Sequence, residues 1–124
     1  DTYQKFWADM QMYTTTMTMP DPQAFMEQFT TWELSQKENK WARRNLSRWQ
    51  NAEYDAAHKA AQVELDPVKR AALFIRMNDL VTGDQHVIPL FARPRPYGVS
   101  GKLRPVLSGW DNTTWALGYW TREG

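Results

Sequence analysis

Residues 8–25 read ADMQMYTTTMTMPDPQAF, and this stretch decides the fold that we expect. Side chains alternate in kind from Phe6 to Thr14, which is the period of a β-strand. Met19-Pro20-Asp21-Pro22 ends that strand. Asp21 suits a helix N-cap and Pro22 a first helical position, because a cap oxygen satisfies free amides and proline has no amide hydrogen. We therefore predict a strand, a short junction and a helix that runs to about Thr31.

The junction between this strand and this helix carries a row of side chains that can form hydrogen bonds. Strand-to-helix junctions are common places for ligand pockets in α/β proteins. One interpretation makes this row a set of ligand donors. The alternative is that the threonines are ordinary strand residues, since β-branched side chains fit strands well. The candidate ligand-binding residues here are Tyr13, Thr14, Thr15, Thr16 and Thr18.

Two further helices have clear local signals. Asn51 is expected to cap a helix that runs to about Glu64, and Asp66-Pro67 repeats the cap-then-proline signal and opens a helix to about Thr82. Residues 32–49 between them and the first helix are polar and without clear period, which predicts a long loop. Loops of that length are usually functional or disordered, and three tryptophans argue against disorder.

A second group of candidate ligand-binding residues lies in that loop. An aromatic face and guanidinium groups close together suit a lid over a ligand that carries a carboxylate or hydroxyls. The alternative is a solvated surface loop. The residues of this group are Trp41, Arg43, Arg44 and Asn45.

The end of the chain is expected to return to a sheet. His86–Ala92 predicts a short buried strand at an edge or a bulge, because of Pro89, and Pro96–Ser100 predicts another. The first strand has no sequential partner, and an isolated strand leaves backbone groups unpaired. We therefore expect an α/β fold that is incomplete on its own, with strands supplied by other polypeptide.

Composition limits the functional classes. The chain has 124 residues, 42% hydrophobic and 23% charged, which suits one globular domain. A net charge of +1 gives no electrostatic case for nucleic acid as a partner or for an anionic membrane. The absence of cysteine excludes disulfides and thiol chemistry, and no stretch reaches the roughly 20 apolar residues of a membrane span. The chain begins at Asp1 without methionine, so we expect that the native N-terminus lies upstream.

Catalytic and metal-binding patterns are missing from the sequence. It contains no GxSxG, HExxH, GxGxxG or GxxxxGK[ST] motif. His58 and His86 have no further ligands at metal-like spacing. We therefore expect neither an enzyme nor a bound cofactor.

Several short motifs, in their order and spacing, resemble the C-terminal portion of the extracellular solute-binding proteins of family 5, the dipeptide- and oligopeptide-binding type that serves ABC importers. The resemblance covers roughly residues 5 to 115. The matching residues are Asp9-Met10-Gln11-Met12; Pro20-Asp21-Pro22 with Phe25; Asn45, Trp49, Asn51 and Glu53-Tyr54-Asp55; Asp66 with Lys69-Arg70; and Ile88-Pro89-Leu90.

The resemblance implies a two-lobed periplasmic-binding-protein-like fold that closes on a solute. Residues 1–85 would end one ligand-binding lobe and include a helical region, and residues 86–124 would return to pack on the other lobe. The implied partners are a small-molecule or peptide solute, the remaining part of the same binding protein and an ABC permease in the membrane. The implied location is periplasmic or extracellular, with a lipid anchor on an upstream segment as one option.

One position departs from the family pattern. Many peptide-binding members have an aspartate four residues before the helix-opening proline, where it pairs with the ammonium group of the peptide. Counted back from Pro22, this position is Thr18, whose hydroxyl cannot neutralise a buried ammonium. A neutral or hydroxyl-rich solute, such as a sugar or a short polar metabolite, therefore fits better. The alternatives are a sugar- or peptide-processing enzyme with an aromatic groove and a small aromatic-rich interaction module.

Overall fold

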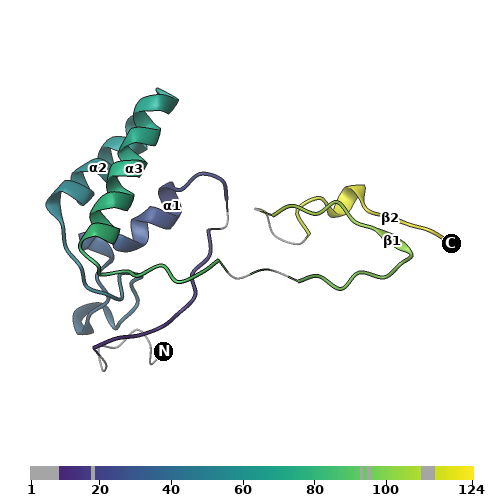
Figure 1. The fold of residues 1–124 in the computed structure, drawn as a ribbon, viewed down its shortest axis with the longest axis horizontal. Helices are drawn as coiled ribbons and strands as arrows, with labels where there is room; N and C mark the ends of the chain where they lie inside the picture. The colour runs from purple at the N-terminus through teal and green to yellow at the C-terminus, as the bar shows by residue number, and fades with distance from the viewer. Residues whose placement is uncertain (1–8, 18, 93, 95, 110–113) are drawn as a thin grey trace. The chain divides into compact units, whose positions relative to one another are not determined.

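The computed structural model describes residues 9–17, 19–92, 94, 96–109 and 114–124 (Figure 1). The chain forms two compact units. The helical unit comprises residues 1–16 and 21–88, and the tail unit comprises residues 17–20 and 89–124. The predicted domains, 1–85 and 86–124, refer to lobes of a larger protein and stay a prediction.

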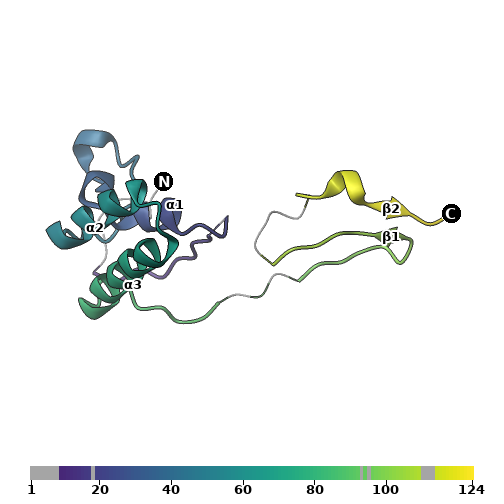
Figure 2. The same cartoon turned by 90° about the horizontal axis from the view of Figure 1, so that it is seen from above.

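Two helices dominate the helical unit and confirm the prediction from the sequence. They are α2 (Ala52–Val63) and α3 (Pro67–Gly83), which lie side by side in both views (Figures 1 and 2). The Asn51 side chain accepts a hydrogen bond from the Tyr54 amide at 3.0 Å and begins α2. Asp66 accepts from the amides of the second and third residues of α3, at 2.9 and 3.3 Å. Short connection and local caps together fix this helical hairpin.

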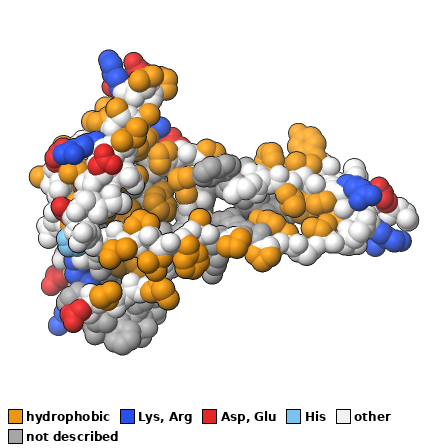
Figure 3. Space-filling model, in the orientation of Figure 1, with side chains coloured by type: hydrophobic (Ala, Val, Ile, Leu, Met, Phe, Trp, Pro, Cys, Tyr) orange, Lys and Arg blue, Asp and Glu red, His pale blue; other side chains and the backbone are white. Residues whose placement is uncertain are grey.

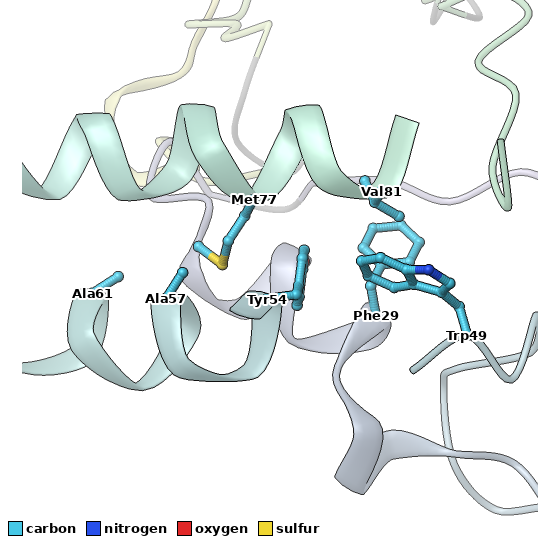
Figure 4. Close-up of a cluster of buried hydrophobic side chains, with 7 residues drawn as sticks. All are labelled: Phe29, Trp49, Tyr54, Ala57, Ala61, Met77 and Val81. Carbon is cyan, nitrogen blue, oxygen red and sulfur yellow. The ribbon is translucent and has the colours of Figure 1, made fainter. Parts of the chain in front are cut away.

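The core of the helical unit lies where α2 and α3 face the chain that precedes them. Tyr54 is at its centre, with the rings of Trp49 and Phe29 edge-on at centroid distances of 5.1 and 6.5 Å. The Tyr54 hydroxyl donates to the Met26 carbonyl at 2.7 Å, and burial raises the pKa of this phenol. The buried cluster consists of Phe29, Trp49, Tyr54, Ala57, Ala61, Met77 and Val81 (Figure 4).

The first helix is shorter than predicted. α1 spans Gln23–Met26 and continues as a 3₁₀ helix, η1 (Glu27–Phe29), so the expected α-helix to Thr31 was wrong in length. The Thr30 backbone is extended, and its hydroxyl donates to the Glu27 carbonyl at 2.8 Å. A hydroxyl that binds the preceding turn competes with helical hydrogen bonds and favours a helix end. A second 3₁₀ helix, η2 (Thr31–Glu33), follows directly.

The predicted strands do not form in the described residues. Residues 9–17 belong to no helix or strand, and Phe6–Ala8 lie outside the described residues. His86–Ala92 is also neither strand nor buried, since Ile88 is 65% exposed and Phe91 76% exposed. Figure 3 shows apolar side chains along the segment that leaves α3. Alternation alone does not form a strand, because a strand needs a hydrogen-bonded neighbour.

The tail unit contains a small antiparallel ribbon instead. β1 (Leu103–Arg104) pairs with β2 (Thr121–Arg122), and a 3₁₀ helix, η4 (Leu117–Tyr119), lies between them in sequence. Pro96–Ser100, expected as a strand, precedes the ribbon without forming one. The α/β class refers to a sheet completed by other polypeptide, so it stays a prediction.

Candidate functional site

The hydroxyl row lies on the extended segment that precedes α1. Thr14, Thr15 and Thr16 are exposed, and Tyr13 is 40% exposed, with partial burial raising the pKa of its phenol. The Thr15 hydroxyl donates to Gln28 Oε1 at 3.3 Å, which joins the row to the helical unit. Thr18 lies outside the described residues. The ligand-binding role of this row stays a prediction.

The second group lies in what we call the anchored loop, residues 34–49. A parallel bridge joins Leu34 at its start to Asn45, where the Asn45 amide donates to the Glu33 carbonyl at 2.7 Å and the Ser35 amide donates to the Asn45 carbonyl at 3.2 Å. A 3₁₀ helix, η3 (Lys37–Asn39), turns the chain between these two residues. Backbone hydrogen bonds therefore close the loop at this bridge.

Asn45 is the most enclosed of the predicted ligand-binding residues, with 1% of its surface exposed. Its side-chain amide donates to the carbonyls of Thr30 and Trp49 at 3.0 and 2.8 Å, and its Oδ1 accepts from the Ser47 hydroxyl at 3.2 Å. The fold thus uses both amide hydrogens and the oxygen. This arrangement accounts for Asn45 as a structural residue, and its role toward a ligand stays a prediction.

Arg43 and Arg44 are half-exposed and paired with acidic side chains. Arg43 Nη1 donates to Glu33 Oε1 at 2.9 Å, and Arg44 Nε lies 3.5 Å from Glu33 Oε2. Arg44 also reaches Glu27 Oε2 at 2.6 Å and the Ala24 carbonyl at 3.2 Å. Glu33 itself is 8% exposed, so the two guanidinium groups balance a nearly buried carboxylate. Arg43 and Arg44 therefore join the loop to α1 and η2.

Three residues of the anchored loop have a left-handed backbone although none is glycine. The φ angles are 55° at Lys40, 63° at Trp41 and 58° at Arg48. Such conformations cost of order 1–3 kcal/mol each and persist only where the surrounding structure fixes them. Two of these three residues contact each other, because the Arg48 guanidinium lies 5.4 Å from the centre of the Trp41 ring. This contact brings a cation and an indole face together within the anchored loop.

Arg48 was not among the residues predicted for this loop. No glycine occurs before Gly83, so a turn of the anchored loop that needs a left-handed residue has to use another residue type. Two successive left-handed residues at Lys40 and Trp41 are the consequence.

A buried histidine forms the other polar cluster of the helical unit. His58 is fully buried, its Nε2 lies 3.0 Å from Gln23 Nε2, and its ring packs edge-on against Trp32 at 5.5 Å. Lys59 Nζ lies 5.2 Å from the centre of the same indole. No group of three or more His, Cys, Asp or Glu side chains in the described part of the chain is placed to hold a metal ion. The described contacts of His58 are those with Gln23 and Trp32.

Comparison of the chain with family models, curated proteins and solved structures gives no match. Within the described residues, no helix has both the length and the apolar character needed to cross a membrane.

Proposed function

We propose that the chain is part of the solute-binding component of an ABC importer, which captures a small polar solute or peptide between two lobes and delivers it to a membrane permease. Lobe closure works because the closed form gains ligand contacts that the open form lacks. Under this proposal the protein works outside the cytoplasmic membrane and catalyses no reaction. The family resemblance is the basis of the proposal, and the helical unit adds one supporting observation.

The observation is that residues of separate motifs contact one another. Asp21 of the Pro-Asp-Pro motif accepts two hydrogen bonds from Arg70 of the Lys-Arg motif, at 2.8 and 3.1 Å, across 49 positions of sequence. Asn45 donates to the Trp49 carbonyl, and the Trp49 ring packs on Tyr54. Contacts between residues of separate motifs are what a shared framework would require, and they are consistent with the proposal.

Tryptophan fluorescence provides the experiment. The seven tryptophans are expected to report solute binding as a saturable change, with no product formed over hours. A suitable panel contains dipeptides, disaccharides and single amino acids. Turnover of a glycoside or a peptide would instead support the enzyme alternative, and no saturable change with any probe would contradict the proposal.

Thr18 provides a site-specific test. Thr18→Val removes a hydroxyl and is expected to weaken solute affinity by about 1–3 kcal/mol, the usual cost of an unsatisfied buried partner. Thr82→Val is the matched control, because the Thr82 hydroxyl donates to the Asn78 carbonyl within α3. Equal affinity for the wild type and Thr18→Val would remove Thr18 from the pocket.

A further inference from the structure

We propose that Gln28 is a positioning residue for Thr15, so that the Thr15 hydroxyl accepts a hydrogen bond from a donor group on the captured solute. The donor is an O–H of a sugar-like solute or an N–H of a peptide ammonium. This inference rests on the proposed function and deepens it, because it names a residue outside the predicted site and a chemical requirement on the solute. It starts from the hydrogen bond that joins the Thr15 hydroxyl to Gln28 Oε1 at 3.3 Å.

The side-chain amide of Gln28 fixes the direction of that hydrogen bond. Gln28 Nε2 donates to the Phe25 carbonyl at 2.8 Å, and a carbonyl oxygen can only accept. The amide nitrogen is therefore committed to Phe25, and the amide oxygen is the atom that meets Thr15. Because this oxygen has no hydrogen to give, the Thr15 hydroxyl has to donate its single hydrogen to Gln28.

This hydrogen bond leaves the Thr15 hydroxyl as an acceptor. A hydroxyl has one hydrogen and two acceptor lone pairs, so both lone pairs remain once Gln28 holds the hydrogen. The Thr15 side chain is exposed, which leaves it accessible to a solute. A hydroxyl that rotates freely pairs with donors and acceptors alike. Held by Gln28, the Thr15 hydroxyl matches a donor, and an acceptor-only group at the same point would place oxygen against oxygen.

The helical unit holds Gln28 firmly in place. Gln28 is 7% exposed and directly precedes Phe29 of the buried cluster. Two residues before Gln28, the Met26 carbonyl accepts from the buried Tyr54 hydroxyl at 2.7 Å. The amide is therefore oriented before a solute arrives, which lowers the entropic cost of binding. Packing alone would be served at lower cost by an apolar side chain, because a buried amide needs hydrogen-bond partners.

The test uses probes that lose one hydrogen-bond donor. For sugars, glucose is compared with a series of monofluoro analogues, in each of which fluorine replaces one hydroxyl and offers no hydrogen. For peptides, dialanine is compared with N,N,N-trimethyl-dialanine, which keeps the positive charge but has no N–H on that nitrogen. Tryptophan fluorescence of the full chain gives each dissociation constant, and the two series distinguish the two sources of the donor.

The preference for the donor is expected to depend on the Thr15 hydroxyl. When the donor that faces Thr15 is removed, the wild type is expected to lose affinity by about fivefold or more, a typical loss for one hydrogen bond. Thr15→Val keeps the shape of the side chain without the hydroxyl and is expected to lose this preference. Thr15→Ser restores a hydroxyl and is expected to keep it. Any effect of probe size alone is the same in all three proteins.

Gln28→Met tests the positioning role, and Gln62→Met is its matched control. Gln28→Met is expected to bind the parent probe with a weaker preference for the donor, because the Thr15 hydroxyl is no longer held. Gln62 is exposed on α2, so Gln62→Met is expected to keep the full preference.

Each other outcome has a defined meaning. Binding with the same donor preference in the wild type and in Thr15→Val, for every probe, overturns the inference and leaves the proposed function standing. A Gln28→Met variant that keeps the full preference, or that melts clearly below the wild type and binds no probe, also overturns the inference, since Gln28 would then not position the hydroxyl. No saturable binding by these probes or by the wider panel overturns the proposed function and this inference with it.

Discussion

Replacing Asn45 by alanine is expected to destabilise the helical unit by about 2–4 kcal/mol. The side chain is 1% exposed and donates to two carbonyls of the fold. The Thr30 carbonyl keeps a second donor, the Glu33 amide at 3.1 Å, so losing that bond costs about 1 kcal/mol. The Trp49 carbonyl loses the donor that the structure gives it, which adds about 1–3 kcal/mol for a buried acceptor.

Urea unfolding followed at 222 nm measures this loss, because α2 and α3 supply most of the helical signal. The measurement is made at two protein concentrations, so that association of the chain does not enter the result. Asn45→Asp distinguishes the effect of lost side-chain volume from the effect of lost hydrogen bonds. It keeps the size of the side chain but provides no donor for the two carbonyls. It is expected to be at least as destabilising as the alanine variant.

Arg43→Ala is the control within the same loop. Arg43 is half-exposed, and Glu33 keeps its contact with Arg44, so the expected loss is below about 1 kcal/mol. If Asn45→Ala loses less than about 0.5 kcal/mol, the buried amide does not hold the loop. The structural explanation of Asn45 would then be refuted, and its amide would again be a candidate ligand donor.

Three further predictions concern the helical hairpin and its ends. Met77 is fully buried in the core, and Met77→Ala is expected to lower the free energy of unfolding in urea by about 2–5 kcal/mol. Ile75 is 63% exposed, and Ile75→Ala is expected to lower it by less than about 0.5 kcal/mol. Equal losses in the two variants would contradict the described core. Hydrogen bonds from Arg70 and from the Gln23 amide hold the pKa of the Asp21 carboxyl below its ordinary value of 3.8. The stabilisation is therefore present above pH 3.8 and is lost as the pH falls through the pKa of the folded state. Between pH 5 and pH 2, the melting temperature of the wild type should therefore fall more than that of Arg70→Gln. The difference should be small, because solvent screens this exposed pair. Gln85→Gly is expected to gain about 0.5 kcal/mol by relieving its left-handed backbone, and a lower melting temperature would contradict this.

The helices could be predicted from the sequence because their signals are local. Asn51 and Asp66 each accept backbone hydrogen bonds within three residues, and a proline follows Asp66 directly. The end of the first helix could not be read in the same way. It depends on a hydroxyl of Thr30 and on the Thr31 amide, which donates to Asp55 across 24 positions of sequence.

The strands were not predictable for a different reason. Alternation in Phe6–Thr14 and the apolar run in His86–Ala92 describe residues that suit a pleated surface. They carry no information on whether a neighbouring strand is present to accept and donate the hydrogen bonds. The described parts of both segments accordingly lie outside any sheet.

The contacts of the anchored loop were predictable only in part, and the ligand-binding role of its residues stays a prediction. The composition of the anchored loop indicated an aromatic and cationic cluster. It could not assign a role to each arginine, because that role depends on which acidic side chain the arginine contacts. Arg44 contacts Glu27 and Glu33, whereas Arg48 lies over Trp41. The backbone differs as well, since Arg48 has a left-handed φ of 58°.

The described part of the tail unit leaves large apolar side chains exposed. In its described part, Ala116 is the buried hydrophobic residue, whereas Trp115 is 52% exposed and Tyr119 80% exposed. The indole nitrogen of Trp120 is buried without a hydrogen-bond partner, which is costly unless an acceptor is supplied. A two-stranded ribbon is marginally stable in water by itself. A second lobe that offered apolar contacts and a carbonyl acceptor would satisfy each of these needs, and the proposed function gives the tail unit such a neighbour.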